Sequence, residues 1–132
     1  ALRVAGKGKI ACNQVLYHLR ERAIEHAVIP WCEKNNVAVV AYSPFGQMAS
    51  PSPASPGGKT LAEIAGAHNA TPRQVALAFL TRKKSVLAIP KASKLAHAEE
   101  NAGAGDLALA AKEIEMIDKA FPLGRPKRLP ML

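Results

Sequence analysis

The sequence has few aromatic residues, two cysteines and no long apolar run, and each shortage excludes a class of protein. Aromatic residues make up 5% of the 132 residues, too few for the stacking platforms that bind single-stranded nucleic acid. No apolar run reaches the roughly 20 residues that a transmembrane helix needs. Cys12 and Cys32 show neither CxxC pairing nor a zinc-site spacing with histidine. We therefore expect no nucleic acid, membrane or metal as a partner, and two inert buried thiols in a reducing cytoplasm.

The excess of positive charge does not reverse this expectation. Lysine and arginine number 18 against 10 acidic residues, for a formal net charge of +8, which in general favours anionic partners. The densest basic clusters are residues 82–84 and 125–128. The first lies at a predicted helix end, where cations stabilise exposed carbonyl groups, and the second lies in a proline-punctuated tail. We interpret both clusters as solvated surface.

Three short apolar runs predict β-strands at residues 10–17, 37–42 and 85–90. The middle run, VAVVAY, has no polar alternation, which is typical of a parallel strand covered on both faces. Helical segments separate the three runs, so the chain is predicted to form βαβ units with a parallel sheet. Three strands are too few to close a barrel, and their open edges favour association.

Helical spacing and capping residues predict the helices between these strands. Residues 21–35 place Ile24, Val28, Trp31 and Cys32 on one apolar face, and Pro30 should start a new turn or kink the helix. Thr60 and Glu63 are predicted to cap a helix that ends near residue 68. Further helices are predicted from Thr71-Pro72 onward and over residues 93–101 and 109–121.

The sequence contains only incomplete versions of the glycine-rich motifs that bind phosphate groups. Gly58-Lys59-Thr60 resembles the end of a P-loop, but the earlier glycine of that motif falls at Pro53. The glycine pairs at residues 6–8 and 103–105 lack the third glycine of a dinucleotide fingerprint. Residues 43–58, rich in proline, glycine and serine, are predicted to form one long mobile loop within a single domain.

Three segments resemble a known family in order and spacing. They are residues 12–19 (CNQVLYHL), 41–46 (AYSPFG) and 88–93 (AIPKAS), the last followed by EENA at 99–102. Together they resemble the sixth, seventh and eighth strands of the aldo-keto reductases. The resemblance implies an α/β fold in which residues 1–132 form a single partial domain. This domain would be the C-terminal half of a (β/α)8 TIM barrel, with residues 43–58 covering the cofactor.

The first two segments match family positions on the nicotinamide side of the cofactor. The resemblance implies that Gln14 hydrogen-bonds the carboxamide, a role that suits an amide because it both donates and accepts. Tyr42 matches the aromatic residue that stacks on the nicotinamide ring. Ser43, Phe45 and Gly46 match the start of the loop that folds over the pyrophosphate. Strand C-terminal ends are where (β/α)8 enzymes place such groups.

The third segment matches positions on the adenosine side. Lys91 matches a cation that contacts the 2′-phosphate, and Glu100 and Asn101 match residues that hold the adenine end. The position after Lys91 is often serine in the family and is alanine here, with Ser93 next to it. His97 stands where the family often has an arginine for the adenine and the 2′-phosphate. Losing that bidentate cation should weaken the preference for NADPH over NADH. The resemblance still favours NADPH, and NADH remains possible.

The resemblance implies an NAD(P)H-dependent cytoplasmic oxidoreductase that reduces small aldehydes or ketones to alcohols. The family's Asp, Tyr, Lys and His tetrad lies in the first half of the barrel, and no residue of this chain matches it. The sequence begins without methionine and reads as a piece of a longer protein. The alternative is a non-catalytic half-barrel that binds nucleotide phosphates or assembles with a partner chain. Taken alone, Gln14, Tyr42 and Lys91 would be ordinary strand-end packing and solvated charge.

Overall fold

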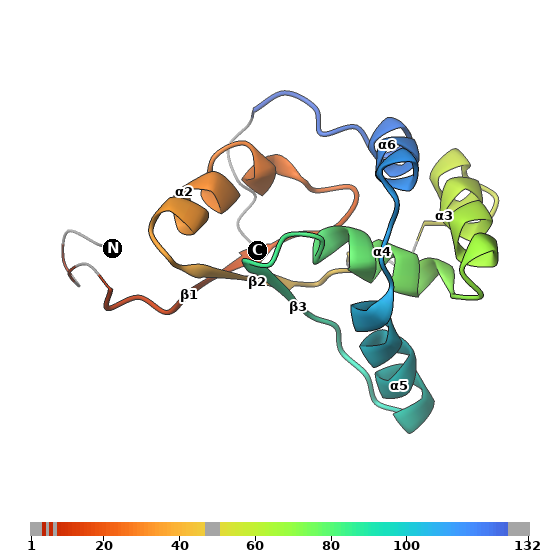
Figure 1. Cartoon of the computed structure of the whole chain (residues 1–132), viewed down its shortest axis with the longest axis horizontal. Coiled ribbons are helices and arrows are strands. Elements are labelled where there is room, and N and C mark those ends of the chain that lie inside the picture. Colours follow the sequence, from red (N-terminus) through yellow and green to blue (C-terminus); the bar gives the residue numbers. More distant parts are fainter. Residues whose placement is uncertain (1–3, 5, 7, 47–50, 127–132) are drawn as a thin grey trace.

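A three-stranded parallel sheet lies at the centre of the fold (Figure 1). The computed structural model describes residues 4, 6, 8–46 and 51–126. The strands, β1 (Cys12–Leu16), β2 (Ala38–Tyr42) and β3 (Val86–Ile89), pair in the order β1-β2-β3. The three predicted strands and their parallel arrangement are confirmed, each strand being shorter than its apolar run.

Helices connect the strands and follow the last one. Figure 1 shows α2 above the sheet, α3, α4 and α6 grouped beside it, and α5 extending from the end of β3. The helices are η1 (Ala23–Glu25), α2 (Val28–Lys34), α3 (Pro56–Ala67), α4 (Pro72–Leu80), α5 (Leu95–Gly103), η2 (Ala104–Asp106) and α6 (Ala111–Ala120).

The two faces of the sheet differ in burial, because successive side chains of a strand point to opposite faces. On one face, Val39, Ala41 and Val86 are buried in the core. The opposite face, called here the open face, is exposed or half-buried at every strand position. It carries Cys12, Gln14, Leu16, Ala38, Val40, Tyr42, Leu87 and Ile89.

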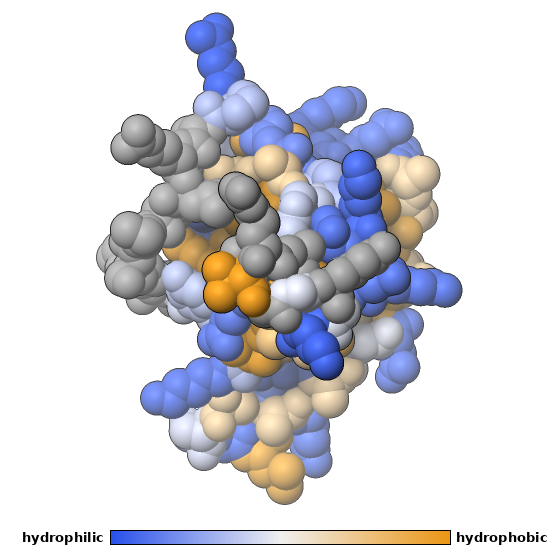
Figure 2. Space-filling view, turned by 90° about the vertical axis from the view of Figure 1, so that its left-hand side faces the viewer, coloured by the Kyte–Doolittle hydropathy of each residue, from blue (hydrophilic) through white to orange (hydrophobic). Residues whose placement is uncertain are grey.

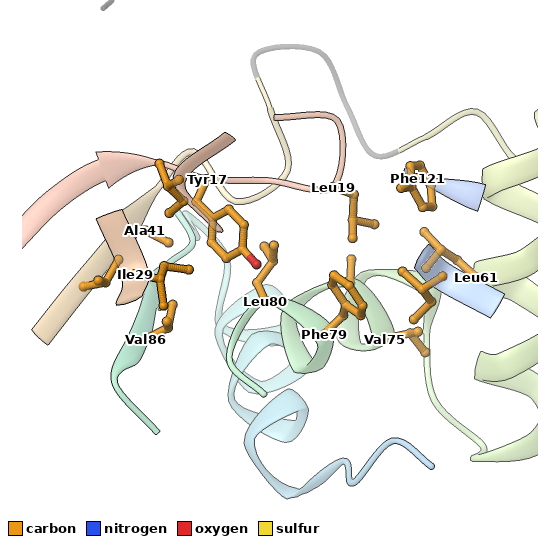
Figure 3. Close-up of a cluster of buried hydrophobic side chains, with 14 of the residues drawn as sticks. Tyr17, Leu19, Ile29, Ala41, Leu61, Val75, Phe79, Leu80, Val86 and Phe121 are labelled. Atoms are coloured by element: carbon orange, nitrogen blue, oxygen red, sulfur yellow. The ribbon is translucent and has the colours of Figure 1, made fainter. Parts of the chain in front are cut away.

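The core lies between the covered face of the sheet and the helices. Figure 3 shows Tyr17, Ile29 and Leu80 beside the sheet, and Phe79 at the centre among side chains from α3, α4 and α6. Val75, Phe79 and Leu80 are buried because α4 places them on its inner faces at helical spacing. The apolar content predicted for this helix is therefore confirmed as core.

The single helix predicted over residues 21–35 is divided. The short η1 ends at Glu25 and α2 begins at Val28. Pro30 is tolerated because it is the third residue of α2, where a backbone N–H has no intrahelical partner. Trp31 was expected in the core but is 43% exposed, and Cys12 was expected to be buried but is exposed on the open face. Cys32 is buried as expected.

The start of α3 differs from the prediction. The helix begins at Pro56, inside the segment predicted as loop, because Ser55 is its N-cap and accepts a hydrogen bond at 3.1 Å from the Gly58 amide. Thr60 lies within the helix, and its hydroxyl donates to the Pro56 carbonyl at 3.1 Å. The prediction of Thr60 as the cap was therefore wrong. Residues 47–50 of the predicted loop lie outside the described residues.

We expect Ser55→Ala to lower the free energy of unfolding by about 1 kcal/mol, the usual cost of losing an N-cap side chain. Thr60→Ala is the matched control. It should change stability by less than about 0.5 kcal/mol, since alanine favours the helix interior. Urea unfolding of both variants measures the difference. A larger loss for Thr60→Ala than for Ser55→Ala would contradict the observed cap.

The surface gives no sign of a membrane-spanning element. Within residues 4, 6, 8–46 and 51–126, no helix combines the length and the apolar character needed to cross a bilayer. The face in Figure 2, which is the left-hand side of Figure 1, is mostly hydrophilic with hydrophobic patches between the polar groups. The described residues also contain no cluster of His, Cys, Asp and Glu that could hold a metal ion.

Candidate functional site

The open face of the sheet brings Gln14 and Tyr42 onto one surface. Gln14 is exposed and pairs in register with Val40 of β2. Tyr42 is half-buried and is the last residue of β2, in register with Leu16 and Ile89. Gln14 therefore lies at the middle of its strand, one row of side chains before Tyr42, and not at the strand end as expected. The two side chains share a face because Gln14 pairs with Val40, which is two residues before Tyr42 on β2, and alternate residues of a strand point to the same face.

A tight turn follows β2 and carries the next three predicted residues. The Gly46 amide donates to the Ser43 carbonyl at 2.8 Å. Ser43 and Gly46 both have positive φ, 49° and 77°, and glycine adopts this conformation without steric cost. Phe45 is half-buried, and the Arg73 guanidinium lies 3.8 Å above the centroid of its ring. The turn therefore holds Phe45 against the first turn of α4.

Three predicted residues lie exposed beyond β3. Lys91 and Ser93 belong to the segment between β3 and α5, and His97 lies in the first turn of α5. All three side chains are open to solvent. Among the described residues, no hydrogen bond or ion pair holds the side chains of Lys91 and His97. The side-chain nitrogens of both residues are therefore available to a ligand.

Glu100 and Asn101 follow on α5 and are half-buried. A carboxylate oxygen of Glu100 accepts a hydrogen bond from the Thr71 hydroxyl at 2.7 Å. The side-chain nitrogen and oxygen of Asn101 are both buried and have no hydrogen-bond partner among the described residues. Buried polar groups are normally paired, and an unpaired one costs free energy. Asn101 therefore has unused capacity both to donate and to accept hydrogen bonds.

A groove of about 460 Å³ runs beside Asn101 along the free edge of β3. Leu87 and Ala88 of β3 line it with Asn101 and with Thr81, the C-cap of α4. Leu87 is 57% exposed and Ile89 is 48% exposed. The free edge is therefore apolar as well as unpaired in the described part of the chain.

A buried charge network, which the sequence pattern did not predict, lies on the other side of the sheet. Glu25 binds Arg22 at 2.7 Å and Arg82 at 2.9 Å, and it accepts from the Tyr17 hydroxyl at 2.7 Å. Arg22 also donates to the Phe121 carbonyl at 2.6 Å. Interpreting residues 82–84 as solvated surface was wrong for Arg82, whose side chain is 18% exposed. No signal in the sequence could pair Glu25 with Arg82 or Arg22 with Phe121, because these residues are 57 and 99 positions apart along the chain.

The network shifts two pKa values in opposite directions. Burial raises the pKa of Tyr17, with Arg82 opposing this effect and Glu25 adding to it. Burial also disfavours the ionised form of Glu25, but hydrogen bonds from Arg22 and Tyr17 and the charge of Arg82 outweigh it. The pKa of Glu25 is therefore lowered. These residues join η1, α4 and α6, and they do not reach the open face.

Sequence comparisons place the chain among known proteins. The aldo/keto reductase family profile matches residues 2–121. The chain is 39% identical over 125 residues to the methylglyoxal reductase YeaE of Escherichia coli, covering 95% of this chain and 44% of that protein. It is 35% identical over 111 residues to the pyridoxine 4-dehydrogenase of E. coli, covering 83% and 37%. The chain thus spans less than half the length of these relatives.

Solved structures give the same result. An aldo-keto reductase from Klebsiella pneumoniae in complex with NADPH has a TM-score of 0.84 and 37% identity, over 92% of this chain and 43% of that one. The thermostable aldo-keto reductase Tm1743, in complex with epalrestat, has a TM-score of 0.74 and 37% identity, over 83% and 39%. The parallel strands and flanking helices are thus part of a (β/α)8 barrel. This chain belongs to the aldo/keto reductase family.

Proposed function

We propose that this chain supplies the cofactor-binding half of an NADPH-dependent reductase of small aldehydes and ketones. The observation that carries the proposal is the buried amide of Asn101, which has no hydrogen-bond partner among the described residues and lies next to Glu100 on α5. A dinucleotide would give the Asn101 amide the partners that it lacks. NADPH in the Klebsiella relative supports this choice of cofactor. NADH is the second candidate, because His97 stands where the family often has the arginine that binds the 2′-phosphate.

Each predicted residue has a role that fits its place in the fold. Gln14 would donate to and accept from the carboxamide, and Tyr42 would stack on the nicotinamide ring from the same open face. Ser43, Phe45 and Gly46 would border the pyrophosphate at the turn after β2. On the adenosine side, Lys91, Ser93 and His97 would surround the 2′-phosphate. Glu100 and Asn101 would bind the adenine, which requires the Asn101 side chain to rotate out of its buried position.

The bound cofactor supplies the hydride, and the residues of this chain bind and orient it. No residue of the chain matches the family's Asp, Tyr, Lys and His tetrad. We therefore propose that residues 1–132 are the C-terminal half of the barrel and are inactive alone. Residues 43–58 would cover the bound cofactor. A protein that joins this chain to a segment carrying the tetrad should oxidise NADPH when methylglyoxal, the substrate named for the E. coli relative, is added.

We expect the 132-residue chain to bind NADPH saturably and Lys91→Ala to weaken that binding about tenfold, because the variant loses a charge-assisted contact to phosphate. NADH affinity should not change, since NADH has no 2′-phosphate. Lys94→Ala is the matched control, an exposed lysine three residues later that should leave both affinities unchanged. Titrations that follow cofactor fluorescence measure each dissociation constant. An absence of NADPH binding by the unaltered chain would overturn the proposal.

A second function is favoured by the free edge of β3. The groove there, which the exposed Leu87 helps to line, would receive a partner chain, and a half-barrel without catalytic residues would act through such an assembly. A stable oligomer of the chain, detected by native mass measurement, together with an absence of cofactor binding, would favour assembly over cofactor binding.

A further inference from the structure

The first turn of α4 contacts two segments that carry proposed cofactor residues, and this inference rests on the proposed function. Thr71 is the N-cap of α4 and its hydroxyl accepts a hydrogen bond from the Gln74 amide at 3.2 Å. The same hydroxyl donates to the Glu100 carboxylate at 2.7 Å. One side chain therefore both starts α4 and fixes the acidic residue of α5.

Arg73, two residues later, contacts the turn after β2. Its guanidinium lies 3.8 Å above the Phe45 ring centroid. The other two arginines that stack on a ring, Arg22 and Arg82, are both ion-paired to Glu25. No carboxylate pairs with Arg73 among residues 8–46 and 51–126. The stacking with Phe45 is therefore the principal contact of this guanidinium and not a consequence of a salt bridge.

The first turn of α4 is held firmly enough to act as a support. Gln74 completes a capping box, because its side-chain oxygen accepts from the Thr71 amide at 2.9 Å. Gly103, at the end of α5, approaches Gln74 so closely that a Cβ there would lie 2.6 Å from the side-chain nitrogen. The absence of a side chain at Gly103 thus lets α5 pack directly on this turn.

We propose that Thr71 and Arg73 are positioning residues for the adenosine and pyrophosphate side of the cofactor. Thr71 fixes Glu100, and Arg73 fixes Phe45. Neither residue contacts the cofactor. Side chains already held in their bound positions lose less conformational freedom when a ligand binds, so the two contacts increase affinity without touching the ligand.

Substitutions at Thr71 separate positioning from helix capping. Thr71→Asp keeps a good N-cap acceptor but cannot donate to Glu100 and repels its charge. Thr71→Ser keeps both functions. We expect Thr71→Asp to weaken binding of 2′-phospho-ADP-ribose, which lacks the nicotinamide, by about tenfold, and Thr71→Ser to bind like the unaltered chain. Thr81→Val is the control, because its hydroxyl bonds only to the Leu77 carbonyl of the same helix.

A double-mutant cycle tests Arg73. We expect Arg73→Leu to weaken binding of the same probe about fivefold in the unaltered chain and to have no further effect in Phe45→Leu, since the interaction that it removes is then already lost. The parallel cycle combines Thr71→Asp with Glu100→Gln, and it should be non-additive in the same way. Thermal unfolding confirms that each variant is folded at the titration temperature.

The outcomes distinguish this inference from the proposed function. Unchanged binding by Thr71→Asp, or additive effects of Arg73→Leu and Phe45→Leu, would overturn the positioning roles while leaving the cofactor site in place. If the effects of Arg73→Leu and Phe45→Leu on binding were additive, Arg73 would contact the phosphate directly and would not act through Phe45. A failure of the unaltered chain to bind either NADPH or 2′-phospho-ADP-ribose would overturn both proposals.

Discussion

Glu25→Gln should lower the free energy of unfolding by about 3 kcal/mol, within the range for breaking a buried ion pair by removing one partner. The carboxylate of Glu25, whose side chain is 11% exposed, binds the buried Arg22 and the largely buried Arg82. The variant keeps the shape of the side chain but leaves the Arg82 guanidinium without its anion, and Arg22 keeps only its ion pair to Asp118 at 2.7 Å. Because these groups also bind the Phe79 and Phe121 carbonyls, the loss affects α4 and the end of α6 together.

The control is Glu33→Gln, which removes an exposed ion pair to Lys83 at 3.4 Å, with both side chains about 40% exposed (42% and 38%). Exposed pairs contribute little, so this variant should lose less than about 0.5 kcal/mol. Urea unfolding at neutral pH measures both variants. Equal losses at the two positions would show that the buried network does not stabilise the fold.

The same network predicts how the free energy of unfolding changes at acidic pH. The pKa of Glu25 is lower in the folded chain than its ordinary value of 4.5. Its contribution is therefore complete above about pH 4.5 and is lost as the pH falls through the folded pKa. The difference in unfolding free energy between the unaltered chain and Glu25→Gln should shrink over that window. A difference that stays constant as the pH falls would contradict the lowered pKa.

Asn101→Leu should have opposite effects on stability and on cofactor binding. In the free chain both polar atoms of this side chain are buried without a described partner, so a leucine of similar size removes an unfavourable burial. We expect the free energy of unfolding to rise by about 1 kcal/mol. The affinity for NADPH should fall by about 30-fold, because two hydrogen bonds to the cofactor are lost.

Asn35→Leu is the matched control. The Asn35 side chain donates to the Trp31 carbonyl at 2.8 Å at the end of α2, so the substitution removes a satisfied contact. It should lower stability slightly and leave NADPH binding unchanged. Urea unfolding and fluorescence titration of both variants are the measurements. A loss of stability in Asn101→Leu as large as that in Asn35→Leu would mean that the Asn101 amide is paired in solution.

The sequence alone predicted the three strands and their parallel order. Apolar runs such as VAVVAY at residues 37–42 and the capping residues Thr71 and Gln74 act over a few positions, so local patterns are sufficient to identify them. The same patterns did not predict where two of the helices begin and end. Residues 21–35 divided into two helices, and α3 was capped by Ser55 and not by Thr60.

Family resemblance predicted which residues form the candidate site, since three motifs occur in order over nearly the whole chain. Only the tertiary structure decided their contacts: Thr71 binds Glu100, Arg73 stacks on Phe45, and Asn101 has no side-chain partner among the described residues. It also decided that Arg82 is part of a buried network, although its sequence neighbours suggested solvated surface. These contacts join residues separated by many positions, and a local pattern carries no information about which distant side chain will be adjacent after folding. Element type was therefore determined by the sequence, and the environment of each functional side chain was determined by packing.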